Sequence, residues 1–318
     1  MSIEALLSKS DGTDETIDLG AWQSRQIASH ELLWIDAEAP DADDLALIRR
    51  SVGLSEKASE ALEIDRDRPA ATVLEDAVEI VVLSLADDDA DDPVALQIIL
   101  GDEWVITRHE QPLPFLAEHR DRISDQRDVG QLTPVQFLVS VLDWHIDRFL
   151  RAAEELERGV EELDDAALRR EEDLLQSLVK MRRRIARVRR LLGMHREVFA
   201  EMVRPDFIGD MEEGDAQALG HASGRLERAI QALAQVREML IGTFDIHMTR
   251  TAQRTNDIMR VLTLASVVLL PSVVLAGVMG MNFKVGLFDE PNLFWVVVGA
   301  MVAMAVGALA TARWRGWL

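Results

Sequence analysis

Two long stretches without a charged residue lie close to the C-terminus of the chain. The first covers residues 261–281 and the second covers residues 293–312. Each supplies the roughly 20 residues that a helix needs to cross the apolar core of a bilayer. The sequence therefore predicts two transmembrane helices, and it predicts that the preceding residues fold outside the bilayer.

The charges beside these stretches predict their orientation. Basic residues gather where the first stretch begins and the second ends: Arg250, Arg254, Arg260, Arg313 and Arg315. The connecting segment, 283–292, holds Lys284, Asp289 and Glu290. By the positive-inside rule, we expect both termini in the cytoplasm and this loop outside. Residues 1–15 show no basic segment followed by an apolar one, so we expect no secretory signal and a multi-pass protein of the inner (plasma) membrane.

The acidity of the chain is concentrated in its N-terminal part. The formal net charge is −22, and residues 1–130 hold 31 of the 56 Asp and Glu but only 11 of the 34 Lys and Arg. Such a field repels nucleic acid and attracts cations, although an acidic face that keeps the domain soluble is an equally good interpretation. The chain has no Cys, which excludes disulfides and thiolate metal sites.

Short apolar runs alternate with helical patterns in the first 130 residues. We predict strands at 32–36, 71–85, 94–100 and 103–110, and helices at 41–52 and 112–123. Residues 1–30 show no pattern. This organisation predicts an acidic cytoplasmic α/β domain over 1–130. An acidic run in one connection could bind a hard cation, but a solvated loop is the simpler interpretation: Asp87, Asp88, Asp89, Asp91 and Asp92.

From Thr133-Pro134 onward the pattern is helical. One helix starts there, a second spans about 170–203 before Pro205, and a third starts near Met211 and continues into the first apolar stretch. If it continues to Gly280 it is about 69 residues and roughly 100 Å long. A helix of that length needs packing along it, which predicts a bundle or a symmetric assembly.

The predicted organisation is therefore an α+β chain: the α/β domain, a helical stalk, two C-terminal spans and a basic tail. Its segments are 1–130 for the α/β domain, 131–257 for the stalk, 258–282 for the first span, 283–292 for the outer loop, 293–312 for the second span and 313–318 for the tail. Within the stalk, the basic run RRRIARVRR (182–190) could touch lipid headgroups, but we expect it to pair with acidic faces of neighbouring helices.

The first span contains Pro271 and ends in AGVMGMNF (276–283). A Gly-Met-Asn tripeptide at the outer end of the first of two C-terminal spans, on a very long helix and with a tail RWRGWL, resembles the CorA family of magnesium and cobalt transporters. The resemblance covers residues 130–318 well and the N-terminal domain in general pattern. It implies a homopentamer with five long helices around a pore and the second spans in an outer ring. It also implies a divalent cation, Mg²⁺, Co²⁺, Ni²⁺ or Zn²⁺, as the transported ion.

A physical argument supports the position of the tripeptide. The C-terminus of a helix leaves carbonyl groups that carry about half a negative charge, and several such ends on one axis attract cations. Magnesium gives up its water reluctantly, so oxygens of Gly280 and Asn282 could hold a hydrated ion without trapping it. We predict Gly280, Met281 and Asn282 as the entry and selectivity site, with Asn282 as a metal ligand.

The resemblance further implies a set of pore-lining residues on the first span and the stalk before it: Asp245, Asn256, Met259, Leu270 and Val273. Met259 and Leu270 would be hydrophobic constrictions that close by losing water, while Asp245 and Asn256 would form rings on the cytoplasmic side, with Asp245 as a second metal ligand. Packing in the core of a bundle is the alternative role for each of them.

Three departures from the family pattern leave the identity of the transported ion undecided. Met279 stands where relatives often have Tyr, Lys284 where an acidic residue often follows the motif, and Val273 replaces a pore Thr. A ring of Lys284 would weaken cation capture unless Asp289 and Glu290 offset it, so transport of zinc by the same fold is a second interpretation.

Several function classes are not expected. There is no P-loop, nucleophile elbow or dinucleotide fingerprint, and no ionisable residue lies in either span, so we expect no enzyme, no cofactor and no coupling to ATP or protons. A divalent ion moving inward gains about 4.6 kcal/mol per 100 mV, which suffices for passive uptake. The competing class is a membrane-anchored acidic sensor or scaffold without flux.

Overall fold

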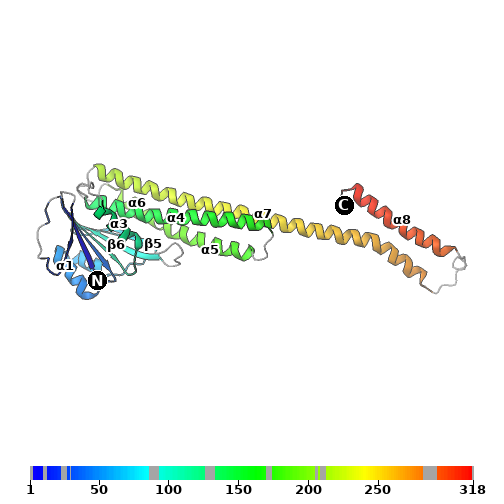
Figure 1. The fold of residues 1–318 in the computed structure, drawn as a ribbon, viewed down its shortest axis with the longest axis horizontal. Helices are drawn as coiled ribbons and strands as arrows, with labels where there is room; N and C mark the ends of the chain where they lie inside the picture. The colour runs from blue at the N-terminus through cyan, green and yellow to red at the C-terminus, as the bar shows by residue number, and fades with distance from the viewer. Residues whose placement is uncertain are drawn as a thin grey trace. The chain divides into compact units, whose positions relative to one another are not determined.

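The computed structural model describes residues 3–9, 13–22, 27–28, 30–85, 93–125, 133–169, 174–204, 207, 213–281 and 292–316. The chain forms two compact units, Met1–Thr243 and Phe244–Leu318, called unit 1 and unit 2 below. The boundary falls within one helix, α7 (Glu213–Met279), which contributes to both (Figure 1).

Unit 1 is built on a seven-stranded sheet with the order β2-β1-β3-β7-β6-β5-β4. The strands are β1 (Ile3–Ser8), β2 (Asp14–Ile17), β3 (Leu32–Glu38), β4 (Ala70–Val73), β5 (Val78–Leu85), β6 (Pro93–Leu100) and β7 (Trp104–His109). β3 and β7 are parallel, and the other neighbouring pairs are antiparallel. All eight residues of β5 are buried, as expected for a strand covered on both faces.

Helices cover both faces of this sheet. α1 (Ala42–Val52) and α2 (Glu56–Glu63) pack on the face that carries Leu33 and Ile35 of β3. Trp34, between Leu33 and Ile35 in the sequence, points to the opposite face of the sheet, which packs against the remaining helices of unit 1. These are α3 (Pro114–Asp125), α4 (Pro134–Arg169), α5 (Leu174–Gly193), α6 (His195–Met202) and the first part of α7. The alternation of β3 side chains between two cores is the two-residue period of a strand.

A capping box starts α4 where Thr133-Pro134 predicted a helix start. The Thr133 hydroxyl accepts from the backbone N–H of Gln136 at 3.1 Å, and the Gln136 side-chain oxygen accepts from the backbone N–H of Thr133 at 3.3 Å.

Two buried polar groups attach other parts of unit 1 to β5. Glu79 on β5 is fully buried, accepts two hydrogen bonds from Arg66 at 2.9 and 3.0 Å, and accepts a third from Gln97 at 2.6 Å. His195, at the start of α6, accepts from the backbone N–H of Leu83 at 2.9 Å. The β4 partner of β5 ends its pairing at Val81, so this imidazole satisfies a donor on the open edge of β5.

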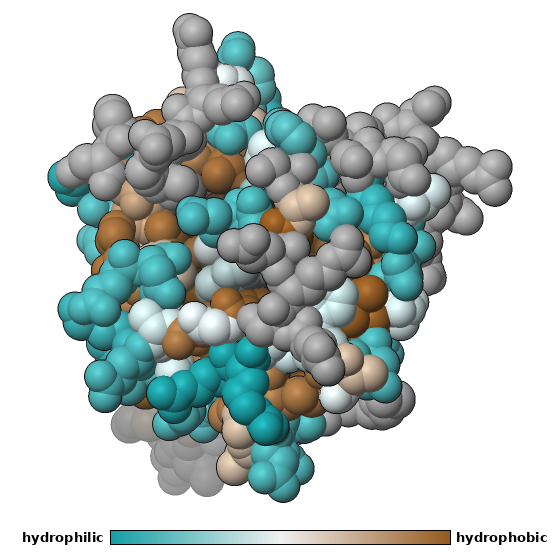
Figure 2. Space-filling view, turned by 90° about the vertical axis from the view of Figure 1, so that its left-hand side faces the viewer, coloured by the Kyte–Doolittle hydropathy of each residue, from teal (hydrophilic) through white to brown (hydrophobic). Residues whose placement is uncertain are grey.

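Unit 2 consists of the second part of α7 and of α8 (Leu293–Trp314). Both helices are long and apolar enough to cross a membrane, and the apolar windows of both contain no buried residue. The two predicted apolar helices and the long helix that enters the first of them are thus present. The end of unit 1 in Figure 2, by contrast, shows many hydrophilic residues around smaller apolar groups, as expected for a surface in water.

The structure corrects several sequence predictions in unit 1. Residues 1–30 are not patternless, because β1 and β2 form there. The predicted strand 71–85 is a hairpin, since Leu74 donates to the carbonyl of Ala77 at 2.8 Å in the turn between β4 and β5. α2 was not predicted. The predicted helix 170–203 is two helices, separated at Met194 after Gly193.

Candidate functional site

The apolar C-terminal part of α7, residues 261–279, exposes most of its side chains, and its half-buried residues lie on one side of the helix: Leu264, Val268, Pro271, Ser272, Leu275 and Met279. Large apolar residues that are at least half exposed include Val261, Leu262, Leu269, Leu270, Val273 and Val278. Water does not tolerate such a continuous apolar surface, so it needs lipid or other helices around it. We therefore take the apolar part of α7, together with the residues that lead into it, as the candidate functional site.

The five residues predicted to line a pore all belong to this one helix. They are Asp245, Asn256, Met259, Leu270 and Val273, and all five are exposed. Their spacings of 11, 3, 11 and 3 residues place them within an arc of about 100° at 3.6 residues per turn. Because α7 is unbroken across these positions, the arc is a continuous face of the helix, called the α7 face below.

The α7 face changes chemistry along its length. Asp245 and Asn256 precede the apolar window, and Leu270 and Val273 lie within it. Met259 is 55% exposed and Val273 is 67% exposed, so neither is held in a core of the single chain. The arrangement offers oxygen ligands first and apolar side chains afterwards along one side of the helix.

The helix ends at the predicted entry site. The N–H of Gly280 donates to the carbonyl of Ala276 at 2.9 Å, and the N–H of Met281 donates to the carbonyl of Val278 at 3.2 Å in a tighter final turn. A Cβ at Gly280 would lie 3.3 Å from the Ala276 oxygen, which is close for a side chain. Asn282, Lys284, Asp289 and Glu290 lie outside the described residues.

α8 contributes a groove beside α7 within unit 2. A cavity of about 330 Å³ is lined by Leu264 and Val267 of α7 and by small residues of α8, including Gly307 and Ala308. Arg315 lies at one end of the groove. Trp295 and Trp314 are 71% and 88% exposed near opposite ends of α8, where aromatic residues commonly contact the bilayer surface.

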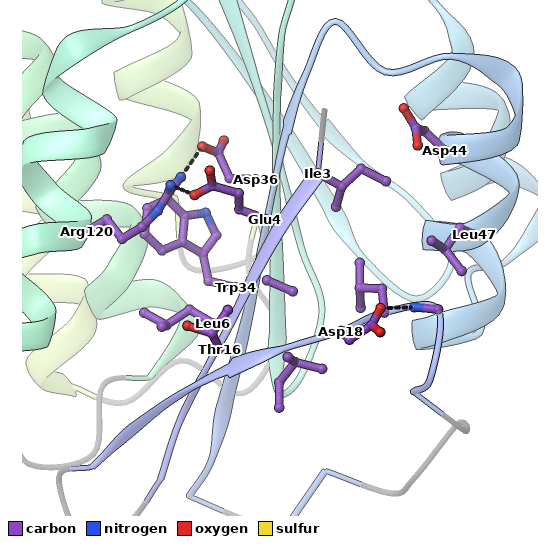
Figure 3. A pocket seen from close by; sticks show the side chains of 14 residues that line it. Ile3, Glu4, Leu6, Thr16, Asp18, Trp34, Asp36, Asp44, Leu47 and Arg120 are labelled. Carbon is purple, nitrogen blue, oxygen red and sulfur yellow. Dashed lines mark hydrogen bonds and ion pairs between the residues drawn. The ribbon is translucent and has the colours of Figure 1, made fainter. Parts of the chain in front are cut away.

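Unit 1 contains a polar cluster that the sequence analysis did not find. Asp36 on β3 accepts from Thr107 at 2.6 Å and from Arg120 at 2.6 Å, and Arg120 also pairs with Glu4. The Arg120 guanidinium lies 5.2 Å from the centre of the Trp34 ring. Figure 3 shows Arg120 and its two carboxylate partners beside a cavity of about 440 Å³.

His109 completes this cluster. Its Nε2 lies 3.3 Å from Asp36, and its Nδ1 lies 2.7 Å from the carbonyl of Gln111. Burial lowers the pKa of His109, but the hydrogen bonds to Asp36 and Gln111 and the charges of Asp36 and Glu38 together outweigh it and leave the pKa raised. The charges in the cluster are matched to one another, which indicates a structural role for it.

One chain by itself does not gather metal ligands in the part that the structure describes. Across the described ranges, no three His, Asp or Glu residues come together in a way that could hold a metal ion. The acidic run at 87–92 lies outside these ranges. The predicted ligand Asp245 is exposed on α7 and would need other copies of the chain to complete a coordination shell.

Known proteins resemble this chain along most of its length. A solved structure of the CorA magnesium transporter from Methanocaldococcus jannaschii superimposes with a TM-score of 0.81 over 99% of this chain and 98% of its own, at 21% identity, which shows a CorA-like fold. The divalent cation transporter CmaX of Pseudomonas aeruginosa is 26% identical over 89% of this chain and 85% of its own. The zinc transport protein ZntB of Yersinia enterocolitica is 22% identical over 88% and 85%.

The family model described as CorA-like Mg²⁺ transporter protein matches residues 29–311. This range includes unit 1 from residue 29 onward, the whole of α7 and most of α8. The chain therefore belongs to the CorA-like metal ion transporter family.

Proposed function

We propose that the chain is one subunit of a homopentameric channel that conducts divalent cations across the inner membrane. Mg²⁺ is the principal ion, Co²⁺ and Ni²⁺ are also accepted, and uptake is passive and driven by the membrane potential. Both termini and residues 1–257 are cytoplasmic, and the loop 283–292 is outside. The observation that carries the proposal is the α7 face, which leads from Asp245 to the end of an exposed apolar helix.

Copies of α7 around one axis would turn each position of the α7 face into a ring. A ring of Leu270 or Met259 narrows the path with apolar side chains, which holds back water and ions when the pore is closed. Rings of Asn256 and Asp245 supply oxygen ligands on the cytoplasmic side. The exposed state of all these residues in one chain supports this role, because they are available to face a shared axis.

The entry site is proposed at Gly280, Met281 and Asn282. The last carbonyls of α7 and the Asn282 amide oxygen would attract a hydrated ion, with the charges of Lys284, Asp289 and Glu290 setting its approach. An amide and carbonyl ring recognises the water shell of the ion, so removal of the amide should abolish conduction.

Zinc is the second candidate ion. Met279 and Lys284 depart from the pattern expected beside Gly-Met-Asn, and ZntB is one of the relatives. Transport of Zn²⁺ would use the same α7 face. The choice of Zn²⁺ over Mg²⁺ would then be set at the entry site, beside Met279 and Lys284.

The test is ion entry into liposomes that contain the purified full-length protein, with a negative-inside potential and Mg²⁺, Co²⁺, Ni²⁺ or Zn²⁺ supplied separately. Wild type and Asn282→Ala are compared with Asn292→Ala, a matched control at the start of α8 whose side chain caps nothing.

Entry of Mg²⁺ that is lost in Asn282→Ala and retained in Asn292→Ala supports the proposal. Entry of Zn²⁺ alone would reassign the ion, and hexaamminecobalt, which cannot shed its ligands, would then not compete. Absence of flux for every ion would overturn the channel and leave the membrane-anchored sensor or scaffold.

A further inference from the structure

α5 is an uncommonly basic helix in an acidic chain. Its 20 residues include seven basic side chains and no acidic one: Lys180, Arg182, Arg183, Arg184, Arg187, Arg189 and Arg190. The predicted pairing with an acidic face of a neighbouring helix is seen at Arg184, which lies 3.7 Å from Glu155 of α4. Within the described part of the chain, Lys180, Arg182, Arg183, Arg189 and Arg190 are exposed and take part in no ion pair.

Four of these arginines form one side of the helix, called the basic face here. Arg182 and Arg183 lie one turn before Ala186, and Arg189 and Arg190 lie one turn after it. The four arginines and Ala186 are exposed. The other side of α5 is buried through Leu178, Ile185 and Leu192. The two arginine pairs are seven residues, or about 10 Å, apart along the helix.

α2 carries a row of opposite charge with the same length. Glu56, Glu60 and Glu63 follow the spacing of one helix face, and all three are exposed, while the opposite side of α2 is buried against the sheet. None of the three glutamates forms an ion pair among the described residues, and Lys57 beside them pairs with Glu75. Glu56 and Glu63 are also seven residues, or about 10 Å, apart. This row is called the acidic ridge here.

The two surfaces lie on opposite sides of unit 1. α2 packs on the sheet face of Leu33 and Ile35, whereas α5 belongs to the core on the other face. One chain therefore cannot join them, but two copies can. A contact between different surfaces of identical chains is heterologous, and it closes into a ring when the rotation between copies is an integral fraction of a turn.

We propose that the acidic ridge of one copy docks on the basic face of α5 in the next copy, and that this contact repeats around the proposed oligomer. An antiparallel arrangement pairs Glu63 with Arg182 and Arg183, and Glu56 with Arg189 and Arg190. It also brings Ile64, which is 48% exposed just after the ridge, beside Val179, which is 40% exposed just before the basic face. The inference rests on the proposed function for the presence of a ring.

Cysteine cross-linking tests this contact directly, because the chain has no Cys. Glu60→Cys and Ala186→Cys are placed in one full-length chain in lipid nanodiscs or liposomes, and the protein is treated with a short bis-maleimide. Packed helices lie 8–10 Å apart, within reach of such a reagent. A ladder of covalent species up to five chains is expected. Each single variant should give no ladder beyond two chains, and a mixture of the two single variants should give one heterodimer.

Charge reversal gives a second readout in the same cysteine background. Glu56→Lys with Glu63→Lys should lower the cross-linking yield about fivefold, because several exposed ion pairs of a few tenths of a kcal/mol become repulsive. Adding Arg182→Glu and Arg190→Glu should restore the yield, which a folding defect would not allow. Recovery supports the contact, and failure to recover overturns it.

The outcome can be separated from that of the channel proposal. Flux through a double-cysteine protein that forms no cross-linked ladder between positions 60 and 186 would overturn this interface and leave the channel standing. A full ladder without flux of any ion would support the interface and overturn conduction.

Discussion

Acidification should destabilise unit 1 through a buried pair of histidines. His195 donates from Nδ1 to the carbonyl of Leu191 at 3.0 Å and accepts at Nε2 from the N–H of Leu83, so it is held as a neutral imidazole. Burial lowers the pKa of His195 to about 4. The ring of His145, 4.8 Å away, is fully buried, and burial together with the charge of His195 lowers the pKa of His145 well below its usual value.

The sign and the size of the effect follow from these shifts. An unfolded chain binds a proton at each histidine near pH 6.5, whereas the folded chain does not, so the stability is complete above pH 6.5 and is lost as the pH falls toward 4. Between pH 7 and pH 5, one group with these two pKa values removes about 2 kcal/mol from the free energy of unfolding. His109 acts in the opposite direction, because its raised pKa stabilises the folded state at low pH.

The assay is urea unfolding of the full-length protein in detergent at pH 7 and pH 5, followed by tryptophan fluorescence and near-UV circular dichroism. His145→Leu removes one of the two buried imidazoles, whose ring nitrogens have no hydrogen-bond partner among the described residues. The variant should lose less free energy of unfolding than wild type on acidification, and the difference is bounded at about 2 kcal/mol by the unfolded-state pKa of one histidine. The exposed His221→Gln is the matched control. Equal losses in His145→Leu and wild type would refute the assignment to this pair.

Three further outcomes are expected. Glu79→Ala should lower the free energy of unfolding by about 3 kcal/mol in the same assay, because Arg66 and Gln97 lose a buried acceptor. The control Glu75→Ala, at an exposed ion pair with Lys57, should leave the free energy of unfolding unchanged. Equal effects of the two substitutions would contradict this account. Gly53→Ala should cost about 1 kcal/mol, seen as a lower Tm, since Gly53 ends α1 with φ of 70°. Leu270→Ser should raise resting Mg²⁺ entry in liposomes by wetting the proposed constriction, and an unchanged rate would count against a gate at this position.

The two apolar helices were predictable because their signal is local. A stretch of 20 residues without a charge, as at 293–312, has few structural alternatives, and α8 begins at Leu293 as predicted. The long helix was predictable for a related reason, since no Pro breaks the pattern between residue 213 and Pro271. The family resemblance, carried by residues 276–283, added the fold of the whole chain.

The errors in unit 1 arise where the local sequence pattern fits more than one structure. β1 alternates only as Ile3, Ala5 and Leu7, which is too short to distinguish from a loop, and it is stabilised by pairing with β3. The hairpin between β4 and β5 was missed because apolar residues continue on both sides of Glu75 and Asp76. The break between α5 and α6 at Gly193 was missed because a glycine can also be tolerated within one helix.

The same distinction between local and long-range signals applies to the α7 face and to the polar cluster around Asp36. The α7 face could be predicted because an unbroken helix converts sequence spacing into direction, so Asn256 and Leu270 share a side whatever else the chain does. The cluster around Asp36 could not, since Arg120 and His109 are 84 and 73 residues away in sequence. The strand register of β3 and β7 brings Asp36 opposite Thr107, and this pairing cannot be predicted from the spacing of residues in the sequence.

Pro271 bears on the choice between a pore and a simple anchor. Proline has no N–H, so the carbonyl of Val267, one turn earlier on α7, receives no helical hydrogen bond. A polar group without a partner is costly in hydrocarbon, and Val267 lies only about 60° from Leu270 around the helix. Water on the side of the α7 face would satisfy this carbonyl, whereas a helix surrounded by lipid would leave it unpaired. Pro271 therefore favours a first span that has water or another helix, not lipid, beside the Val267 carbonyl.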